Sequence, residues 1–362
     1  MFYDNNLPMI DEPEVLFETR GQIALVTMNA PKSLNALSLN MIRLIQPKLT
    51  AWASDDSVAA VVVQGAGEKA FCAGGDIRDM YNERGTNFSE IYFGAEYALN
   101  VGIHTFPKPY IALMDGITMG GGAGMSVHGS HRVLSERTTF AMPETGIGLF
   151  PDIGGTWFLS CCPGQVGMYL GLTGYRMKAA DTLYAGLGDF YVESNHNAEL
   201  IAALAEANPA DQGAASAIIK SFSSDPGPAP LAEYRETIDR CFAGDSVEAI
   251  LAALEAEGTE WSDKHLRMLA TKSPTSLKLT FRQLRLGPNI ESIADIMEME
   301  YRMANRSYRG HDMFEGIRAV VIDKDGAPKW EPDTLTAVSH ADIDEYFEPV
   351  PGEPDFKAAQ LS

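Results

Sequence analysis

Glycines and carboxyl groups that could act together on a carbonyl compound are concentrated in residues 119–152, MGGGAGMSVHGSHRVLSERTTFAMPETGIGLFPD. The segment begins with three consecutive glycines, residues 120–122. Glycine lets a ligand approach the backbone closely, and N–H groups at the start of a helix can stabilise an oxyanion. Glu144 and Asp152 could supply a base, an acid or a nucleophile. The alternative is that the glycines are close-packing positions and the acids are solvated loop charges.

Two weaker patterns compete with this interpretation. Residues 65–70, GAGEKA, fit the loose dinucleotide-binding fingerprint after a strand. A true fingerprint leads directly into a helix, whereas another glycine turn, residues 71–76 (FCAGGD), follows here. His128 and His131 have a spacing that a metal could use on one helix face, but no third ligand lies nearby in the sequence. We therefore expect packing or surface histidines and no metal site.

The elements that must position these residues have the order of an α/β domain. A short strand is predicted at 21–28 and buried-type strands at 58–64 and 110–114, and each glycine loop follows one of the two buried-type strands. Helices are predicted at 38–53 with Ser38 as N-cap, from Asp76 onward, and at 86–105. After Asp152 the pattern becomes mostly helical, with helices expected at 164–173, 178–186, 198–207, 246–257, 273–286 and 290–308, a linker at 223–230, and a short strand or turn at 316–324.

Length and charge restrict the class of protein. A chain of 362 residues predicts one large domain with an elaboration, or two domains. The net charge of −21 argues against general nucleic-acid binding and against an anionic membrane surface, and no apolar run is long enough to span a membrane. The first 17 residues lack the early Lys or Arg of a secretory or transit signal, and the four cysteines form no CxxC pair. We expect a cytoplasmic protein with reduced thiols.

Several motifs resemble the crotonase (enoyl-CoA hydratase/isomerase) superfamily. They are KAFCAGGDIR at 69–78, the triple glycine and MPE at 142–144. Longer stretches from about residue 21 to 347 are similar to a branch that hydrolyses short 3-hydroxyacyl-CoA thioesters. The resemblance implies an α/β fold in which a spiral of ββα turns, residues 1–200, carries the acyl-CoA site. A mostly helical region, residues 201–362, would follow.

The resemblance also implies roles for individual residues. The backbone N–H groups of Gly75 and Gly121 would hold the thioester oxygen. A hydratase of this superfamily has one glutamate where this chain has Gly124 and another where it has Glu144. Where the hydratase pattern has a glycine, this chain has Asp152. This exchange of carboxylates favours thioester hydrolysis over hydration, with Glu144 attacking directly or activating a water while Asp152 orients it and meets the substrate hydroxyl.

Two more residues come from the resemblance. Glu96, in FGAEYALN, matches a substrate-contacting position, and Lys32 belongs to a segment that resembles one lining the CoA site. The simpler interpretations are a solvated helix face for Glu96, a surface charge for Lys32 and an N-cap for Asp152. We expect an acyl-CoA as the small-molecule partner and no separate cofactor, because coenzyme A is part of the substrate. Whether the chain forms a homo-oligomer is left open.

Two other functions remain open at this stage. One is an enoyl-CoA hydratase/isomerase that acts on another acyl-CoA. The other is a non-catalytic binding module built on the same fold. The retained set of Gly75, Gly121, Glu144 and Asp152 argues against the second, because a binding module has no need of paired carboxyl groups beside an oxyanion site.

Overall fold

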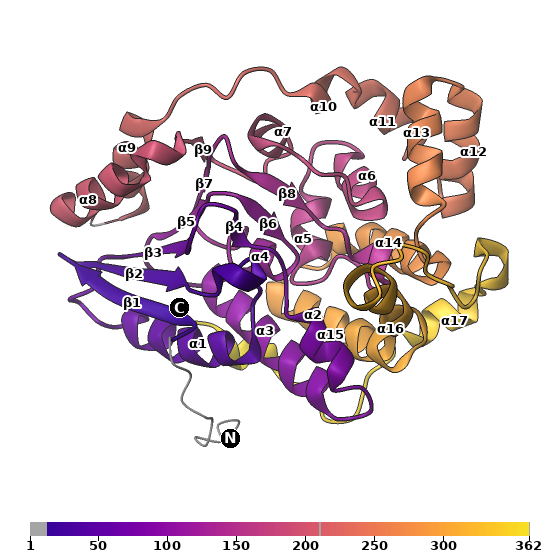
Figure 1. Ribbon diagram of the computed structural model, residues 1–362, viewed down its shortest axis with the longest axis horizontal. Coiled ribbons are helices and arrows are strands. Elements are labelled where there is room, and N and C mark those ends of the chain that lie inside the picture. The colour runs from indigo at the N-terminus through magenta and orange to yellow at the C-terminus, as the bar shows by residue number, and fades with distance from the viewer. Residues whose placement is uncertain (1–12, 210, 362) are drawn as a thin grey trace.

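The computed structural model describes residues 13–209 and 211–361 (Figure 1). Its strands are β1 Val15–Arg20, β2 Ile23–Met28, β3 Ala60–Gly65, β4 Ala70–Cys72, β5 Tyr110–Met114, β6 Ile117–Met119, β7 His131–Leu134, β8 Thr139–Ala141 and β9 Phe190–Tyr191. Six of them form one sheet in the order β1-β2-β3-β5-β7-β9, and three form a second sheet in the order β4-β6-β8. Neighbouring strands are parallel, apart from the antiparallel pair β1 and β2.

From β3 to β8, consecutive strands belong alternately to the larger and the smaller sheet. Strands β3, β5 and β7 belong to the larger sheet, and the strand after each of them, β4, β6 and β8, belongs to the smaller one. Helices follow these strand pairs, so the chain repeats a ββα turn and advances by one strand in each sheet. The predicted spiral is confirmed. Strands β4, β6 and β8 have three residues each and are too short for an alternating pattern to reveal them in the sequence.

The helices are α1 Leu39–Ala53, α2 Ile77–Asn82, α3 Phe88–His104, α4 Gly121–Gly124, α5 Gly155–Ser160, α6 Val166–Thr173, α7 Ala179–Tyr184, α8 Asn197–Ala207, α9 Gln212–Phe222, α10 Pro230–Glu233, α11 Arg235–Cys241, α12 Val247–Glu257, α13 Glu260–Leu269, α14 Pro274–Leu286, α15 Ile293–Arg309, α16 Asp312–Ile317 and α17 His340–Glu345. The predicted N-cap is confirmed, because Ser38 accepts from Met41 N–H. The helix predicted from Asp76 is α2, which the Asp76 side chain caps. Of the predicted linker 223–230, residues 223–229 run without regular structure across to α10, which begins at Pro230 (Figure 1).

Both faces of the larger sheet are covered, as the continuous apolar runs of its central strands require. Val61 and Val63 of β3 face the main core, whereas Val62 belongs to a separate cluster on the opposite face. Leu200 of α8 and Ile219 of α9 cover that second cluster, and Figure 1 shows both helices beside the sheet. The boundary predicted near residue 200 thus falls at a helix that packs on the spiral, and the two-part division remains a prediction.

Two local expectations can be compared with the structure. The strand or turn expected at 316–324 is wrong, because α16 continues into a π-helix, Arg318–Ile322. Ala319 is buried while Val320 is 50% exposed, so the apolar residues here do not lie in one buried strand. The glycine pattern at 65–70 leads into strand β4 instead of a helix, which excludes the dinucleotide-binding alternative. Within the described ranges, no helix combines the length and apolar character needed to cross a membrane.

Candidate active site

A pocket of about 470 Å³ lies where the glycine loops, α3 and the segment after β8 meet. Four of the predicted site residues line it, namely Gly75, Glu96, Glu144 and Asp152. They come from the turn after β4, from the middle of α3, from the 3-10 helix Glu144–Ile147, and from the loop before α5. The spiral therefore collects residues from four separate segments around one cavity.

The backbone N–H of Gly75 has no acceptor within the described part of the chain. Leu37 N–H donates to Gly74 O over 2.8 Å, and Asp76 N–H donates to Leu37 O over 3.0 Å. This parallel bridge pairs Leu37 with the carbonyl of Gly74 and the N–H of Asp76, the two neighbours of Gly75. The N–H of Gly75 is not part of the bridge, and no described residue accepts a hydrogen bond from it. The turn can present this donor to a ligand.

Gly121, the first residue of α4, lies against Gly75. A Cβ at Gly121 would be 3.1 Å from Gly75 N and 2.7 Å from Glu96 Oε1. Only glycine fits there without displacing a neighbour. Across residues 13–209 and 211–361, no acceptor is assigned to Gly121 N–H either. An oxyanion site needs two free backbone donors on adjoining segments, and these two glycines supply them, although Gly121 itself is not among the residues that line the pocket.

The three acids of this site are almost completely buried. Glu96 is 3% exposed, and Glu144 and Asp152 are each 5% exposed. Glu96 Oε1 and Glu144 Oε2 have no hydrogen-bond partner among the described residues. Burial, followed by the charge of Asp152, raises the pKa of Glu96 and of Glu144 well above the usual range. Burial also raises the pKa of Asp152 to about 6. Glu96 therefore does not lie on a solvated helix face.

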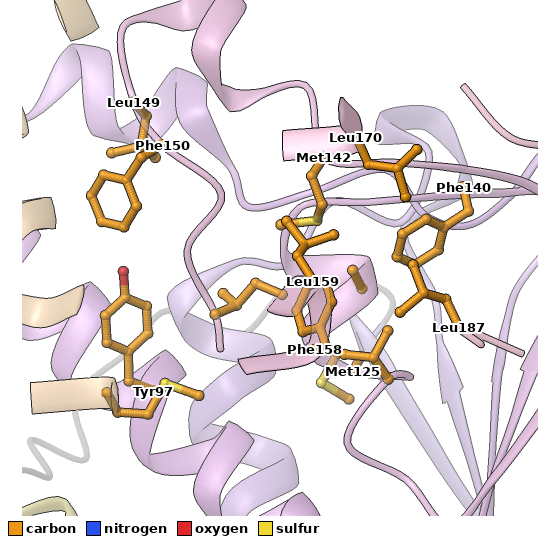
Figure 2. Close-up of a cluster of buried hydrophobic side chains, with 14 of the residues drawn as sticks. Tyr97, Met125, Phe140, Met142, Leu149, Phe150, Phe158, Leu159, Leu170 and Leu187 are labelled. Atoms are coloured by element: carbon orange, nitrogen blue, oxygen red, sulfur yellow. The ribbon is translucent and has the colours of Figure 1, made fainter. Parts of the chain in front are cut away.

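Asp152 is held by its side chain and not used as a helix cap. Tyr97 Oη donates to Asp152 Oδ2 over 2.7 Å, and Figure 2 shows the Tyr97 hydroxyl directed away from its own helix toward the Leu149–Phe150 segment. The N–H groups of Gly154 and Thr156, at the start of α5, donate to Glu300 over 2.7 and 2.9 Å. Glu300 thus has the capping role that the sequence allowed for Asp152.

The loop that carries Asp152 has further buried supports. His128 Nε2 is 2.7 Å from Ile153 O, and Gln283 Nε2 donates to Pro151 O over 2.7 Å. Burial lowers the pKa of His128 to about 3, so its ring is neutral and donates through Nε2. Neither supporting role was recognisable in the sequence. The spacing of His128 and His131 suggested only a packing or surface histidine, and Gln283 carries no motif.

His131 lies in β7, and its Nε2 contacts Ser216, whereas His128 Nε2 contacts Ile153 O. The two histidines therefore do not share a ligand. Within the described part of the chain, no group of three or more His, Cys, Asp or Glu side chains is placed to hold a metal ion.

The position that lacks the hydratase glutamate is closed by packing. A Cβ at Gly124 would be 2.7 Å from Asn100 Nδ2 and 3.2 Å from Ile153 Cβ. A glutamate could not enter this space unless the side chains of Asn100 and Ile153 moved. The structure thus gives a physical reason for the absence of a carboxylate at residue 124.

Lys32 lies outside this arrangement. It is exposed in the 3-10 helix Pro31–Ser33 and is not among the residues that line the pocket. The cations that do line the pocket are Arg176 and Lys272. Sequence reasoning did not find either, because a single basic residue carries no motif.

Comparison with known proteins places the chain in a family. The family model described as enoyl-CoA hydratase/isomerase matches residues 23–347. A relative from Danio rerio is 46% identical over 92% of this chain and 89% of its own, and one from Xenopus tropicalis is 45% identical over 93% and 89%. Both are named 3-hydroxyisobutyryl-CoA hydrolase, mitochondrial. A crystal structure described as a carnitinyl-CoA dehydratase from Mycobacterium thermoresistibile has a TM-score of 0.90 and 39% identity, covering 96% of this chain and 99% of that one.

The prediction of a cytoplasmic protein is wrong by this comparison, because both relatives are named as mitochondrial. That prediction rested on the first 17 residues, of which 1–12 lie outside the described residues, and on cysteines that form no disulfide pattern. Reduced thiols do not distinguish one reducing compartment from another. The family match itself covers both glycine loops, all three buried acids and the helices after α9. The chain belongs to the enoyl-CoA hydratase/isomerase family.

Proposed function

We propose that this chain hydrolyses the thioester of 3-hydroxyisobutyryl-CoA to 3-hydroxyisobutyrate and CoA, the activity that the names of its relatives state. The observation that carries the proposal is the arrangement of carboxyl groups. Glu144 and Asp152 line one pocket with Gly75, while Gly124 is too closely packed to hold the second acid of a hydratase. On the same basis, we propose that the reaction serves valine breakdown.

In the proposed reaction, the N–H groups of Gly75 and Gly121 stabilise the negative charge that develops on the thioester oxygen. A preorganised donor of this kind contributes about 3 kcal/mol. Both groups are free in the structure, so no internal hydrogen bond has to break before the substrate binds.

Glu144 has two possible routes to the acyl carbon. As a general base, it takes a proton from water, the water oxygen bonds to the acyl carbon, and the C–S bond breaks to release CoA thiolate, which is then protonated. As a nucleophile, its oxygen forms a mixed anhydride with release of the thiolate, and water then cleaves the anhydride. A thiolate leaves readily, so neither route needs a separate acid for the leaving group. Hydrolysis in ¹⁸O-water under single-turnover conditions tests the anhydride route, because label enters Glu144 only when water attacks an anhydride at the Glu144 carbonyl carbon.

Asp152 and Glu96 complete the proposed site. Asp152 orients the attacking group and meets the substrate hydroxyl, supported by Tyr97. Glu96 Oε1 lies beside Gly121, next to the place where the thioester would bind, and contacts the substrate. No separate cofactor takes part in this scheme.

The test is release of free CoA from (S)-3-hydroxyisobutyryl-CoA, followed with a thiol reagent. Glu144→Gln and Asp152→Asn remove a charge at nearly constant size, and each should lower kcat by about 10²-fold to 10⁴-fold. CoA binding should survive in both variants, because the glycine loops are unchanged. Parent-like turnover in both variants would instead favour a non-catalytic binding module.

A hydratase acting on another acyl-CoA is the second candidate, because one similar structure is described as a dehydratase. Crotonyl-CoA distinguishes the two functions, since efficient hydration without thiol release would replace hydrolysis as the proposal. The oligomeric state is a separate question, which sedimentation analysis would answer.

A further inference from the structure

Lys272 lies beside the segment that carries Glu144. The next residue, Ser273, donates its backbone N–H to Thr145 O over 3.1 Å, which fastens the two segments together. Lys272 Nζ lies over Gly146, 3.3 Å from where a Cβ would be. The ammonium group therefore crosses the 3-10 helix of Glu144 at a glycine and lines the same pocket.

Lys272 is a half-buried cation that has no ion-pair partner among the residues the structure describes. The lysines of the described chain that do form ion pairs are Lys278 and Lys357, each with a carboxylate within 3.0 Å. Most lysines of the described residues form no ion pair, so the feature that distinguishes Lys272 is its place at the edge of a pocket lined by three acids. A buried charge is costly without compensation, so its location requires an explanation.

The three acids of the pocket have different neighbours. Asp152 accepts a hydrogen bond from Tyr97, and Glu144 has the ammonium group of Lys272 nearby. For Glu96, neither a cation nor a donor is found within the described ranges. The charged or titratable groups around Glu144 are Glu96 and Tyr92 from α3, Asp152, Arg176 and Lys272.

We propose that Lys272 is a positioning residue that stabilises the ionised form of Glu144 during hydrolysis. The proposal rests on the proposed function, because Glu144 must be ionised to act as base or nucleophile. Its physical basis is that the charge of Asp152 opposes ionisation of Glu144, whereas the charge of Lys272 favours it. Lys272 accordingly lowers the pKa of Glu144, which partly offsets the larger increase caused by burial.

The test is the pH profile of CoA release by Lys272→Met, which keeps a long side chain and removes the charge. Its acid-side midpoint should move up by about one pH unit, the low end of the effect of a nearby opposite charge. Activity should fall about tenfold below the midpoint and recover at high pH, with KM nearly unchanged. Lys272→Arg should restore the parent profile. Lys264→Met, on the exposed face of α13, makes the same change in net charge and should leave the profile unaltered.

A second readout does not depend on activity. In protein labelled with ¹³C at glutamate Cδ, the Glu144 resonance, assigned through Glu144→Gln, should titrate at higher pH in Lys272→Met than in the parent. The Glu96 resonance should move less. A Glu144 midpoint that does not change overturns the proposal, whether or not the protein hydrolyses the thioester. Absence of CoA release from the parent, together with a shifted Glu144 midpoint, would instead remove the proposed function and retain the influence of Lys272 on Glu144.

Discussion

The hydroxyl group of Tyr97 donates a hydrogen bond to Asp152 Oδ2 over 2.7 Å and so joins α3 to the loop before α5. Both side chains are buried, with Tyr97 0% and Asp152 5% exposed. Burial raises the pKa of Asp152 to about 6, and the bond from Tyr97 is the strongest influence in the opposite direction. Because a hydrogen bond to a carboxylate favours its charged form, Tyr97 keeps Asp152 ionised near neutral pH.

Tyr97→Phe removes this donor without creating a large cavity. The pKa of Asp152 should rise above its value of about 6, so that ionised Asp152 is lost at a higher pH than in the parent. We expect severalfold lower CoA release at pH 6 and nearly parent activity at pH 8.5, measured as kcat across pH. Tyr234→Phe, at a partly exposed ring, serves as the control. An equal loss at every pH would mean that Tyr97 acts through packing and not through the charge of Asp152.

Gly121→Ala tests the oxyanion site. The added Cβ would meet Glu96 Oε1 at 2.7 Å and Gly75 N at 3.1 Å, so the two donors could no longer adjoin. Loss of one oxyanion donor costs about 10²-fold to 10³-fold in kcat, and we expect a loss of this size from steady-state kinetics. Gly213→Ala, at an exposed position in α9, should retain parent activity. Unchanged kcat in Gly121→Ala would remove this residue from the site.

Glu144→Gln should stabilise the fold at alkaline pH. The pKa of Glu144 is raised in the folded state, so the folded protein holds this proton more tightly than the unfolded chain. Its contribution to stability is therefore largest below the unfolded value near 4.5 and is lost as the pH rises toward the folded value. Urea unfolding should show Glu144→Gln more stable than the parent by about 1 kcal/mol at pH 8, with a smaller difference at pH 5. Glu255→Gln, on an exposed face of α12, should show no such pH-dependent gain.

Lys32→Glu tests the predicted contact with CoA. Lys32 is exposed and lies outside the pocket lining, so any contact would be with a phosphate at the surface. Isothermal titration with CoA should show weaker binding, with a larger difference at low salt because the contact is partly screened. Lys220→Glu, in α9, makes the same change in charge at a position distant in the sequence and serves as the control. Equal CoA affinity for the Lys32 and Lys220 variants would exclude Lys32 from the CoA site.

The sequence by itself determined those features that depend on local chemistry. Gly75, Gly121, Glu144 and Asp152 lie in contiguous motifs, and the family resemblance that these motifs carry predicted two glycine loops facing one site. The continuous apolar runs of β3 and β5 likewise predicted a sheet that is covered on both faces. Neither motifs nor apolar runs define the boundary between the two predicted parts of the chain or the cellular compartment. The predicted compartment, the cytoplasm, was wrong.

Only the tertiary structure decided which neighbours each acid has. Tyr97 and Lys272 come from segments far from Asp152 and Glu144, and Glu300 occupies the capping role that the sequence permitted for Asp152. The physical reason is that the pKa of a carboxyl group depends on burial and on charges within a few ångströms, which residues distant in the chain supply. A motif identifies a carboxyl group, but folding determines whether it is charged.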